Sequence, residues 1–119
     1  MDKLTLSDNG EKIHQAMIEC DGISSSSHRY GGTEYKLGKR EIGHVHGNFL
    51  VDIPFPMKIR NQIVESGEAE PHHILPESGW VSIFIKNEND INRAITLLKK
   101  SYLLAVEQLK KRINEEANQ

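Results

Sequence analysis

The feature that most constrains the fold is a stretch in which apolar and polar residues alternate with a period of two. Between Thr33 and Phe55 this alternation is interrupted twice, at Gly38-Lys39 and at Gly47-Asn48. A period of two is typical of a β-strand with one buried face, and glycine beside a polar residue is typical of a tight turn. The stretch therefore predicts an antiparallel meander of about three strands. Pro54 and Pro56 end it, because proline has no N–H to donate to a neighbouring strand.

Helical periodicity flanks this meander on both sides. Ser7–Gly22 and Met57–Ser66 carry apolar residues three to four positions apart, and a longer helix runs from about Asn87 or Asn89 to Asn114. Trp80–Lys86 is rich in β-branched and aromatic residues and predicts a fourth strand. The order predicts an α+β fold, with N-terminal, middle and long C-terminal helices and an antiparallel sheet of about four strands. With 119 residues, the chain is expected to form a single domain, residues 1–119.

The C-terminal helix is longer than a compact domain of this size needs. At about 1.5 Å per residue it spans roughly 40 Å. Its apolar stripe continues through Leu109 to Ile113. We therefore expect the last two turns of its tail, residues 103–119, to protrude or to meet a partner, and the partner to test is a second copy in a homodimer.

Charge and composition exclude several classes of function. Fifteen basic and seventeen acidic residues give a net charge of −2, unlike the basic surface of a dedicated nucleic-acid-binding module. The single cysteine, Cys20, excludes an internal disulfide. The first twenty residues lack the apolar core of a signal peptide, and no apolar run reaches the roughly 20 residues that span a bilayer. We therefore expect a cytoplasmic protein without nucleic-acid or membrane partners.

Histidine is the residue type with an unusual distribution, because five of the six lie between residues 28 and 73. His44 and His46 are two apart on a predicted strand, so their imidazoles point to the same side and can reach one metal ion or one substrate. His72 and His73 follow on a polar loop. Three interpretations stay open: hydrogen bonds across a half-buried sheet face, a metal site, and a metal-free site that binds or protonates a ligand.

The loop 71–80 adds further candidate ligand-binding side chains. It carries Glu77 and Ser78 in front of Trp80, and binding residues concentrate on loops that a rigid scaffold holds. The indole of Trp80 is suited to wall an apolar pocket, although packing in the core is the commoner role of tryptophan. Ser78 lacks the flanking glycines of a nucleophile elbow, so we do not interpret it as a catalytic serine.

Five ordered motifs resemble those of the small luciferase-domain family, which is largely bacterial and related to the luciferase of light-emitting fungi. The resemblance covers residues 28–102, and the N-terminal helix and the tail lie outside it. The motifs are His28-Arg29-Tyr30-Gly31-Gly32, Glu41-Ile42-Gly43-His44-Val45-His46-Gly47, Asp52-Ile53-Pro54-Phe55-Pro56, Pro71-His72-His73-Ile74-Leu75-Pro76 and Ser78-Gly79-Trp80-Val81-Ser82.

This resemblance implies a reaction class and a set of site residues. The reaction is the addition of oxygen to a small hydroxylated pyranone, without a metal or a flavin. More distantly, the strand and helix at the end of the chain resemble those of the MmcQ/YjbR-type α+β proteins. Among the family's recurrent polar residues, the catalytic candidates are His44, His46, His72, His73, Asp52 and Glu41. The ligand-binding candidates are His28, Arg29, Ser78 and the neighbouring Trp80.

Three hypotheses about function follow. In the first, which we favour, the domain binds or transforms a small organic molecule at a histidine-rich polar site without any cofactor. In the second, it is a non-catalytic interaction protein that uses the long C-terminal helix. In the third, the histidines bind a metal ion.

Overall fold

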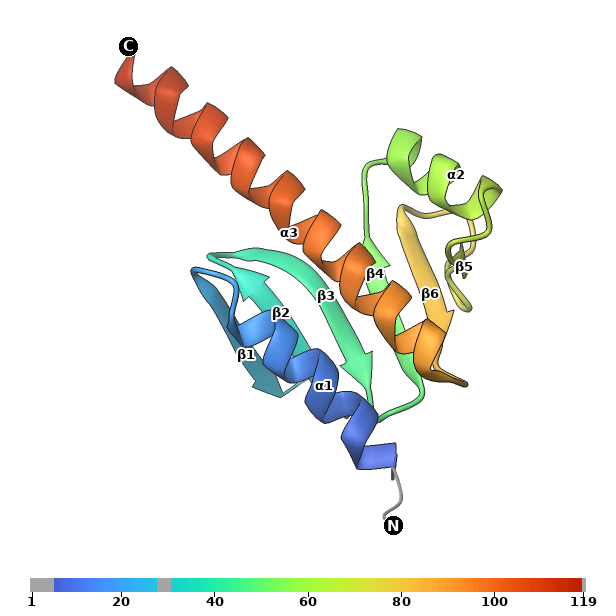
Figure 1. The fold of residues 1–119 in the computed structure, drawn as a ribbon. Coiled ribbons are helices and arrows are strands. Elements are labelled where there is room, and N and C mark those ends of the chain that lie inside the picture. The colour runs from blue at the N-terminus through green and yellow to red at the C-terminus, as the bar shows by residue number, and fades with distance from the viewer. Residues whose placement is uncertain (1–5, 28–30, 119) are drawn as a thin grey trace.

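The computed structural model describes residues 6–27 and 31–118, which form three helices and one antiparallel sheet of six strands, ordered β1-β2-β3-β4-β6-β5 (Figure 1). The predicted α+β class and the three predicted helices are confirmed. The elements are α1 (Leu6–Ile18), β1 (Ile23–Ser27), β2 (Thr33–Leu37), β3 (Arg40–His46), β4 (Leu50–Pro54), α2 (Met57–Glu65), β5 (Glu70–Pro71), β6 (Trp80–Phe84) and α3 (Glu88–Ala117).

The sheet has six strands rather than the four expected, and both additional strands lie at its edges. β1 consists of Ile23 and four serines, which have no marked preference for strands, yet it pairs along its length with β2. β5 is only two residues long and pairs with β6 at the opposite edge, where a proline such as Pro71 is tolerated. Edge strands made of exposed polar residues carry no hydrophobic alternation, so their sequence gave no sign of them.

The first helix also ends earlier than expected. α1 stops at Ile18, and the chain turns through Gly22, whose φ of +84° favours glycine. Ile13 and Met17 are buried, as their spacing predicts. The spacing also predicts that Cys20 continues the buried stripe of Ile13 and Met17, but Cys20 lies in the turn after the helix and is only partly buried.

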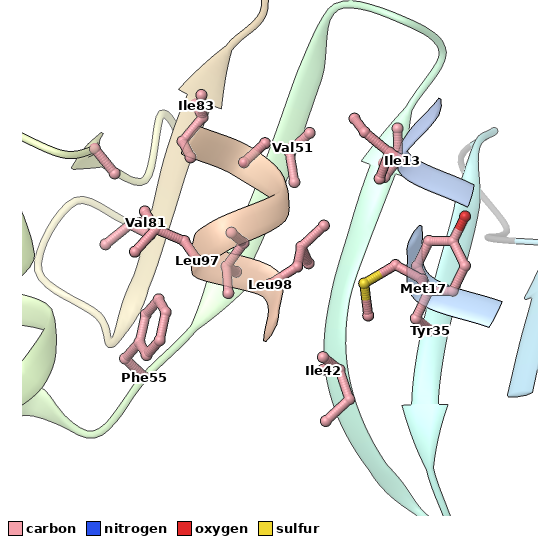
Figure 2. Packing of buried hydrophobic residues seen from close by; sticks show 14 of the residues in the cluster. Ile13, Met17, Tyr35, Ile42, Val51, Phe55, Val81, Ile83, Leu97 and Leu98 are labelled. Carbon is pink, nitrogen blue, oxygen red and sulfur yellow. The ribbon is translucent and has the colours of Figure 1, made fainter. Parts of the chain in front are cut away.

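The hydrophobic core lies between the sheet and two helices, because α1 and α3 cover the same face of the sheet (Figure 1). Leu97 and Leu98 of α3 pack against Val51 and neighbouring strand residues (Figure 2). α3 begins with a reciprocal cap, in which the Asn87 side chain accepts from the Asp90 N–H and the Asp90 carboxylate accepts from the Asn87 N–H.

The alternation of β4 is confirmed with one exception. Val51 and Ile53 are fully buried in the core, and Asp52 between them points to the opposite face of the sheet. Strict alternation would also place Phe49 on the face of Val51 and Ile53, but Phe49 is 55% exposed because the strand begins only at Leu50. The opposite face is therefore where the polar candidates of β3 and β4 meet.

A β-bulge in β3 changes which residues share a face. Tyr35 pairs with Gly43 and Lys36 pairs with Glu41, so Ile42 is an extra residue without a partner in β2. Ile42 is consequently buried in the core instead of sharing the face of His44, as strict alternation predicts. The same bulge brings Glu41 onto the face of His44, three residues away.

Gly43 allows α3 to approach the sheet directly behind this bulge. A Cβ atom at this position would lie 2.5 Å from Leu98 Cδ2 and 3.0 Å from the carbonyl oxygen of Asp52. We predict that Gly43→Ala lowers the free energy of unfolding by about 2 kcal/mol, because α3 must move away from a well-packed core. Urea unfolding followed by circular dichroism measures this. Gly38→Ala is the control, because a Cβ atom at Gly38 has nothing within 4 Å, as is also true at Gly67. The φ of +63° at Gly38 adds backbone strain to the cost of this control. A cost for Gly43→Ala below that of Gly38→Ala would contradict the prediction.

The C-terminal part of α3 extends beyond the sheet (Figure 1). From Glu107 onward its described side chains are exposed, including Leu109 and Ile113. Within residues 6–27 and 31–118, no helix combines the length and the hydropathy that crossing a membrane requires.

Candidate functional site

A row of polar side chains crosses the face of the sheet that lies opposite α1 and α3. Strand pairing places Glu34 of β2 beside His44, His44 beside Asp52, and Asp52 beside Ser82 of β6, with Glu70 of β5 at the end. His46 is on the same face as His44, because residues two apart in a strand point the same way. The sheet thus brings together residues that are far apart in the sequence, since Glu34 and Ser82 are 48 positions apart.

Asp52 is the centre of this site. Its Oδ2 atom lies 3.2 Å from His44 Nε2, 3.1 Å from His46 Nε2 and 3.4 Å from His72 Nε2. Its Oδ1 atom accepts a hydrogen bond of 2.7 Å from Ser82 Oγ and lies 3.8 Å from His73 Nδ1. Four imidazoles therefore surround one fully buried carboxylate, and we call these five residues the His–Asp cluster.

The loop that follows β5 brings His72 and His73 over the sheet. His72 Nδ1 accepts hydrogen bonds from the backbone N–H groups of Ile74 and Leu75, at 3.2 and 3.0 Å. An Nδ1 atom that accepts two hydrogen bonds carries no proton, so neutral His72 has its proton on Nε2, which faces Asp52. The backbone N–H of His73 holds the loop further, because it donates a hydrogen bond of 3.3 Å to Ser82 Oγ.

Two carboxylates, one at each ring nitrogen, hold His44 in its charged form when no ligand is bound. Its Nδ1 atom lies 2.7 Å from Glu41 Oε2, and its Nε2 atom lies near Asp52. Burial by itself lowers the pKa of His44, but the hydrogen bonds to Asp52 and Glu41 outweigh burial and raise this pKa to about 9.

The pKa values of Asp52 and His72 are both lowered, which favours the charged form of the carboxylate and the neutral form of the imidazole. Burial disfavours the charge of Asp52, yet the hydrogen bonds from His44 and Ser82 hold the pKa of this carboxyl below its usual value. Burial lowers the pKa of His72, in agreement with a neutral ring whose Nδ1 atom accepts two amide hydrogens. The site therefore holds a charged imidazole, His44, and a neutral imidazole, His72, on one carboxylate, and perturbed groups of this kind concentrate at functional sites.

A pocket of about 370 Å³ opens onto the cluster. The lining of this pocket, the His–Asp pocket, combines the cluster with apolar side chains. The ring centroid of Trp80 lies 4.9 Å from that of His44 and 6.1 Å from that of His72. Ile74 and Leu75 also line the pocket and are 71% and 54% exposed. An apolar wall above convergent polar groups is the usual form of a site for a small organic molecule.

Most of the residues predicted from sequence are brought together here. Glu41 contacts His44, and the pocket is lined by His44, His46, Asp52, His72, His73, Ile74, Leu75 and Trp80. Ser78 is not among these lining residues, because its hydroxyl donates to the Leu75 carbonyl and accepts from the Trp80 N–H within the loop. His28 and Arg29 lie outside the described residues, so their role as ligand-binding residues stays a prediction.

Ser82 is the functional residue that the sequence analysis missed. It is fully buried, donates to Asp52 and accepts from the His73 N–H, so it links the carboxylate to the loop. A hydroxyl between Val81 and Ile83 in an otherwise apolar strand was the available signal, because a buried polar group needs a specific partner.

Two overlapping groups in the site also have the composition of a metal centre. His44, His46 and Asp52 place one ligand atom each within 4.8 Å of one another, and so do Asp52, His72 and His73. Imidazole nitrogen and carboxylate oxygen are ordinary ligands of first-row divalent metals.

Comparison with known proteins gives one match. No curated protein and no solved structure matches the chain. The distant likeness to MmcQ/YjbR-type proteins therefore stays a prediction. The family model described as Luciferase domain matches residues 39–101, which is more than half of the chain and includes every described member of the His–Asp cluster. The chain belongs to the Luciferase domain family.

Proposed function

We propose that the His–Asp pocket binds a small organic molecule and exchanges protons with it. The observation that carries this proposal is the convergence of four imidazoles on Asp52 beneath an apolar wall. Asp52 is fully buried, so it orients the imidazoles instead of meeting the ligand itself. His46 and His73 have the more exposed rings, 28% and 32%, and they are the groups that we expect to touch the ligand.

The proposed chemistry needs only the side chains of the pocket. A histidine imidazole can donate a proton to a ligand or accept one from it, so His46 and His73 are the groups that we expect to exchange protons with the bound molecule. Trp80, Ile74 and Leu75 offer an apolar surface for the body of the molecule. Membership of the Luciferase domain family supports a hydroxylated pyranone as the first molecule to test, and oxygen addition as the first reaction.

The fluorescence of Trp80 provides a direct binding test, because it is the protein's single tryptophan and lines the pocket. We predict that 4-hydroxy-6-methyl-2-pyranone, added to tag-free protein treated with EDTA, changes this fluorescence in a saturable manner. His46→Ala is expected to weaken binding at least about tenfold, the effect of losing one charged or well-placed hydrogen bond. Oxygen uptake in the same mixture tests the reaction.

The control for this experiment is His14→Ala. His14 belongs to α1, hydrogen-bonds Tyr35 and lines a separate pocket on the helical side of the sheet. Its removal should leave binding at the His–Asp pocket unchanged. Equal binding by the His46→Ala and wild-type proteins, or no saturable signal with the pyranone and related phenols and enols, would argue against the proposal.

A second candidate function, self-association through α3, is supported by the exposed apolar side chains of its C-terminal half. Leu109 and Ile113 lie four residues apart on one face of α3, and they are 43% and 54% exposed on a helix that extends beyond the sheet. An exposed apolar stripe of this kind is typical of a helix that meets a partner. We propose that two chains pair through this stripe.

Light scattering over a range of concentrations tests the pairing. We predict that Ile113→Glu raises the dissociation constant of the dimer by at least about tenfold, because a carboxylate replaces an apolar contact. Asn114→Glu introduces the same charge at the neighbouring exposed position and should leave the dimer intact. A wild-type protein that stays monomeric at all concentrations would refute self-association.

A further inference from the structure

The spacing of three donor atoms in the pocket matches the coordination shell of a metal ion. His44 Nε2 and His46 Nε2 lie 3.2 and 3.1 Å from Asp52 Oδ2, and the three atoms lie within 4.8 Å of one another. Metal bonds of about 2.1 Å that meet at roughly 90–110° place neighbouring donor atoms about 3.0–3.4 Å apart. The two distances to the carboxylate fall within this range.

Glu41 orients His44 as the partner of a metal ligand would. Its carboxylate lies 2.7 Å from His44 Nδ1. This contact holds a proton on Nδ1 and directs the Nε2 atom of the ring toward Asp52. Metal-binding histidines almost always donate their second N–H to such a carboxylate or carbonyl. Glu41 reaches this position only because the bulge at Ile42 turns it onto the same face as His44.

The hydrogen bonds of His72 exclude it from the same ligand set. Its Nδ1 atom accepts from two backbone N–H groups, so its Nε2 atom holds the proton and has no lone pair for a metal ion. His72 instead donates toward Asp52 Oδ2, at 3.4 Å. Hydrogen bonds of this kind fix a ligating carboxylate from outside the coordination shell.

We propose that His44, His46 and Asp52 bind one first-row divalent transition metal ion, with Glu41 as a positioning residue. Two imidazoles and one carboxylate occupy one side of the ion and leave its remaining positions directed at the pocket, the arrangement of metal sites that also bind a small molecule. Asp52 and Glu41 together offset the charge of a divalent cation. This inference goes beyond the proposed function, which concerns binding of an organic molecule by the metal-free pocket.

Cobalt(II) and zinc(II) are the probes for this site. Tag-free protein is treated with EDTA, exchanged into buffer, and titrated with each metal by calorimetry, while the visible absorption of cobalt reports its ligands. We expect one equivalent per chain. Glu41→Gln should lower the affinity by about 10–100-fold without changing the stoichiometry, and His46→Ala should abolish stoichiometric binding.

Two further variants separate this ligand set from other arrangements. His72→Asn should keep both the 1:1 stoichiometry and the cobalt spectrum, because His72 is not a ligand. His14→Ala, which removes a histidine of α1, should behave like the wild-type protein. No stoichiometric binding, unchanged binding in a folded His46→Ala protein, or loss of the cobalt spectrum in His72→Asn would overturn the assignment. None of these outcomes bears on fluorescence binding of the pyranone to EDTA-treated protein, so the two proposals can fail independently.

Discussion

Replacing Asp52 by asparagine is expected to lower the free energy of unfolding by about 3 kcal/mol. The substitution keeps the shape of the side chain and removes its charge, while the charged imidazole of His44 still lies against it. Removing one partner of a buried ion pair costs about 3–5 kcal/mol. The lower end applies here because the cluster opens onto a pocket, where the His46 side chain is 28% exposed and solvent screens the ion pair.

The measurement is urea unfolding in the presence of EDTA, followed by circular dichroism, so that bound metal makes no contribution. Ser82→Ala is the control, because it removes the 2.7 Å hydrogen bond to Asp52 Oδ1, together with the acceptor of the His73 backbone N–H, and leaves the carboxylate charged. It should cost about 1–2 kcal/mol. If Asp52→Asn costs no more than Ser82→Ala, the charge of Asp52 does not hold the cluster together.

The sequence was sufficient to predict the part of the site that depends on local periodicity. His44 and His46 share a face because they are two apart on a strand, and Asp52 faces away from the core because Val51 and Ile53 face into it. The class of the fold followed from the same patterns, since a period of two and a helical period alternate along the chain.

The sequence was not sufficient for features that depend on pairing between distant strands. The bulge at Ile42 exists because Gly43 pairs with Tyr35 and Glu41 with Lys36, and this register has no local signature. Strict alternation therefore placed Ile42 on the wrong face. In the same way, the pairing of β4 with β6 decides that Ser82 lies beside Asp52, and this pairing joins residues 30 positions apart.

The loop that covers Asp52 was the hardest part to foresee. The sequence identified its histidines as candidates, but the two imidazoles have different roles that only their hydrogen bonds reveal. His72 is buried and caps the loop backbone, whereas His73 is partly exposed at the pocket. Adjacent residues in an irregular loop have no fixed relation of faces, so periodicity cannot distinguish them.

This difference makes His72→Leu the second substitution with a large expected effect, a loss of about 3 kcal/mol in the free energy of unfolding. Leucine fills much of the same space but cannot accept a hydrogen bond. The N–H groups of Ile74 and Leu75 then lose their partner. A buried unsatisfied group costs about 1–3 kcal/mol, and because these two hydrogen bonds are only partly buried, the lower half of this range applies to each. The wall of the pocket should become mobile, and binding of the pyranone should weaken with it.

His72→Asn separates this capping role from a general need for histidine. The side-chain oxygen of asparagine can occupy the place of Nδ1 and accept the same two hydrogen bonds, so this variant should lose less than about 1 kcal/mol. Urea unfolding gives both free energies, and amide hydrogen exchange at Ile74 and Leu75 reports the loop directly: it should accelerate in His72→Leu and remain slow in His72→Asn. Equal losses in the two variants would mean that contact with Asp52, rather than capping of the loop, is what His72 contributes to stability.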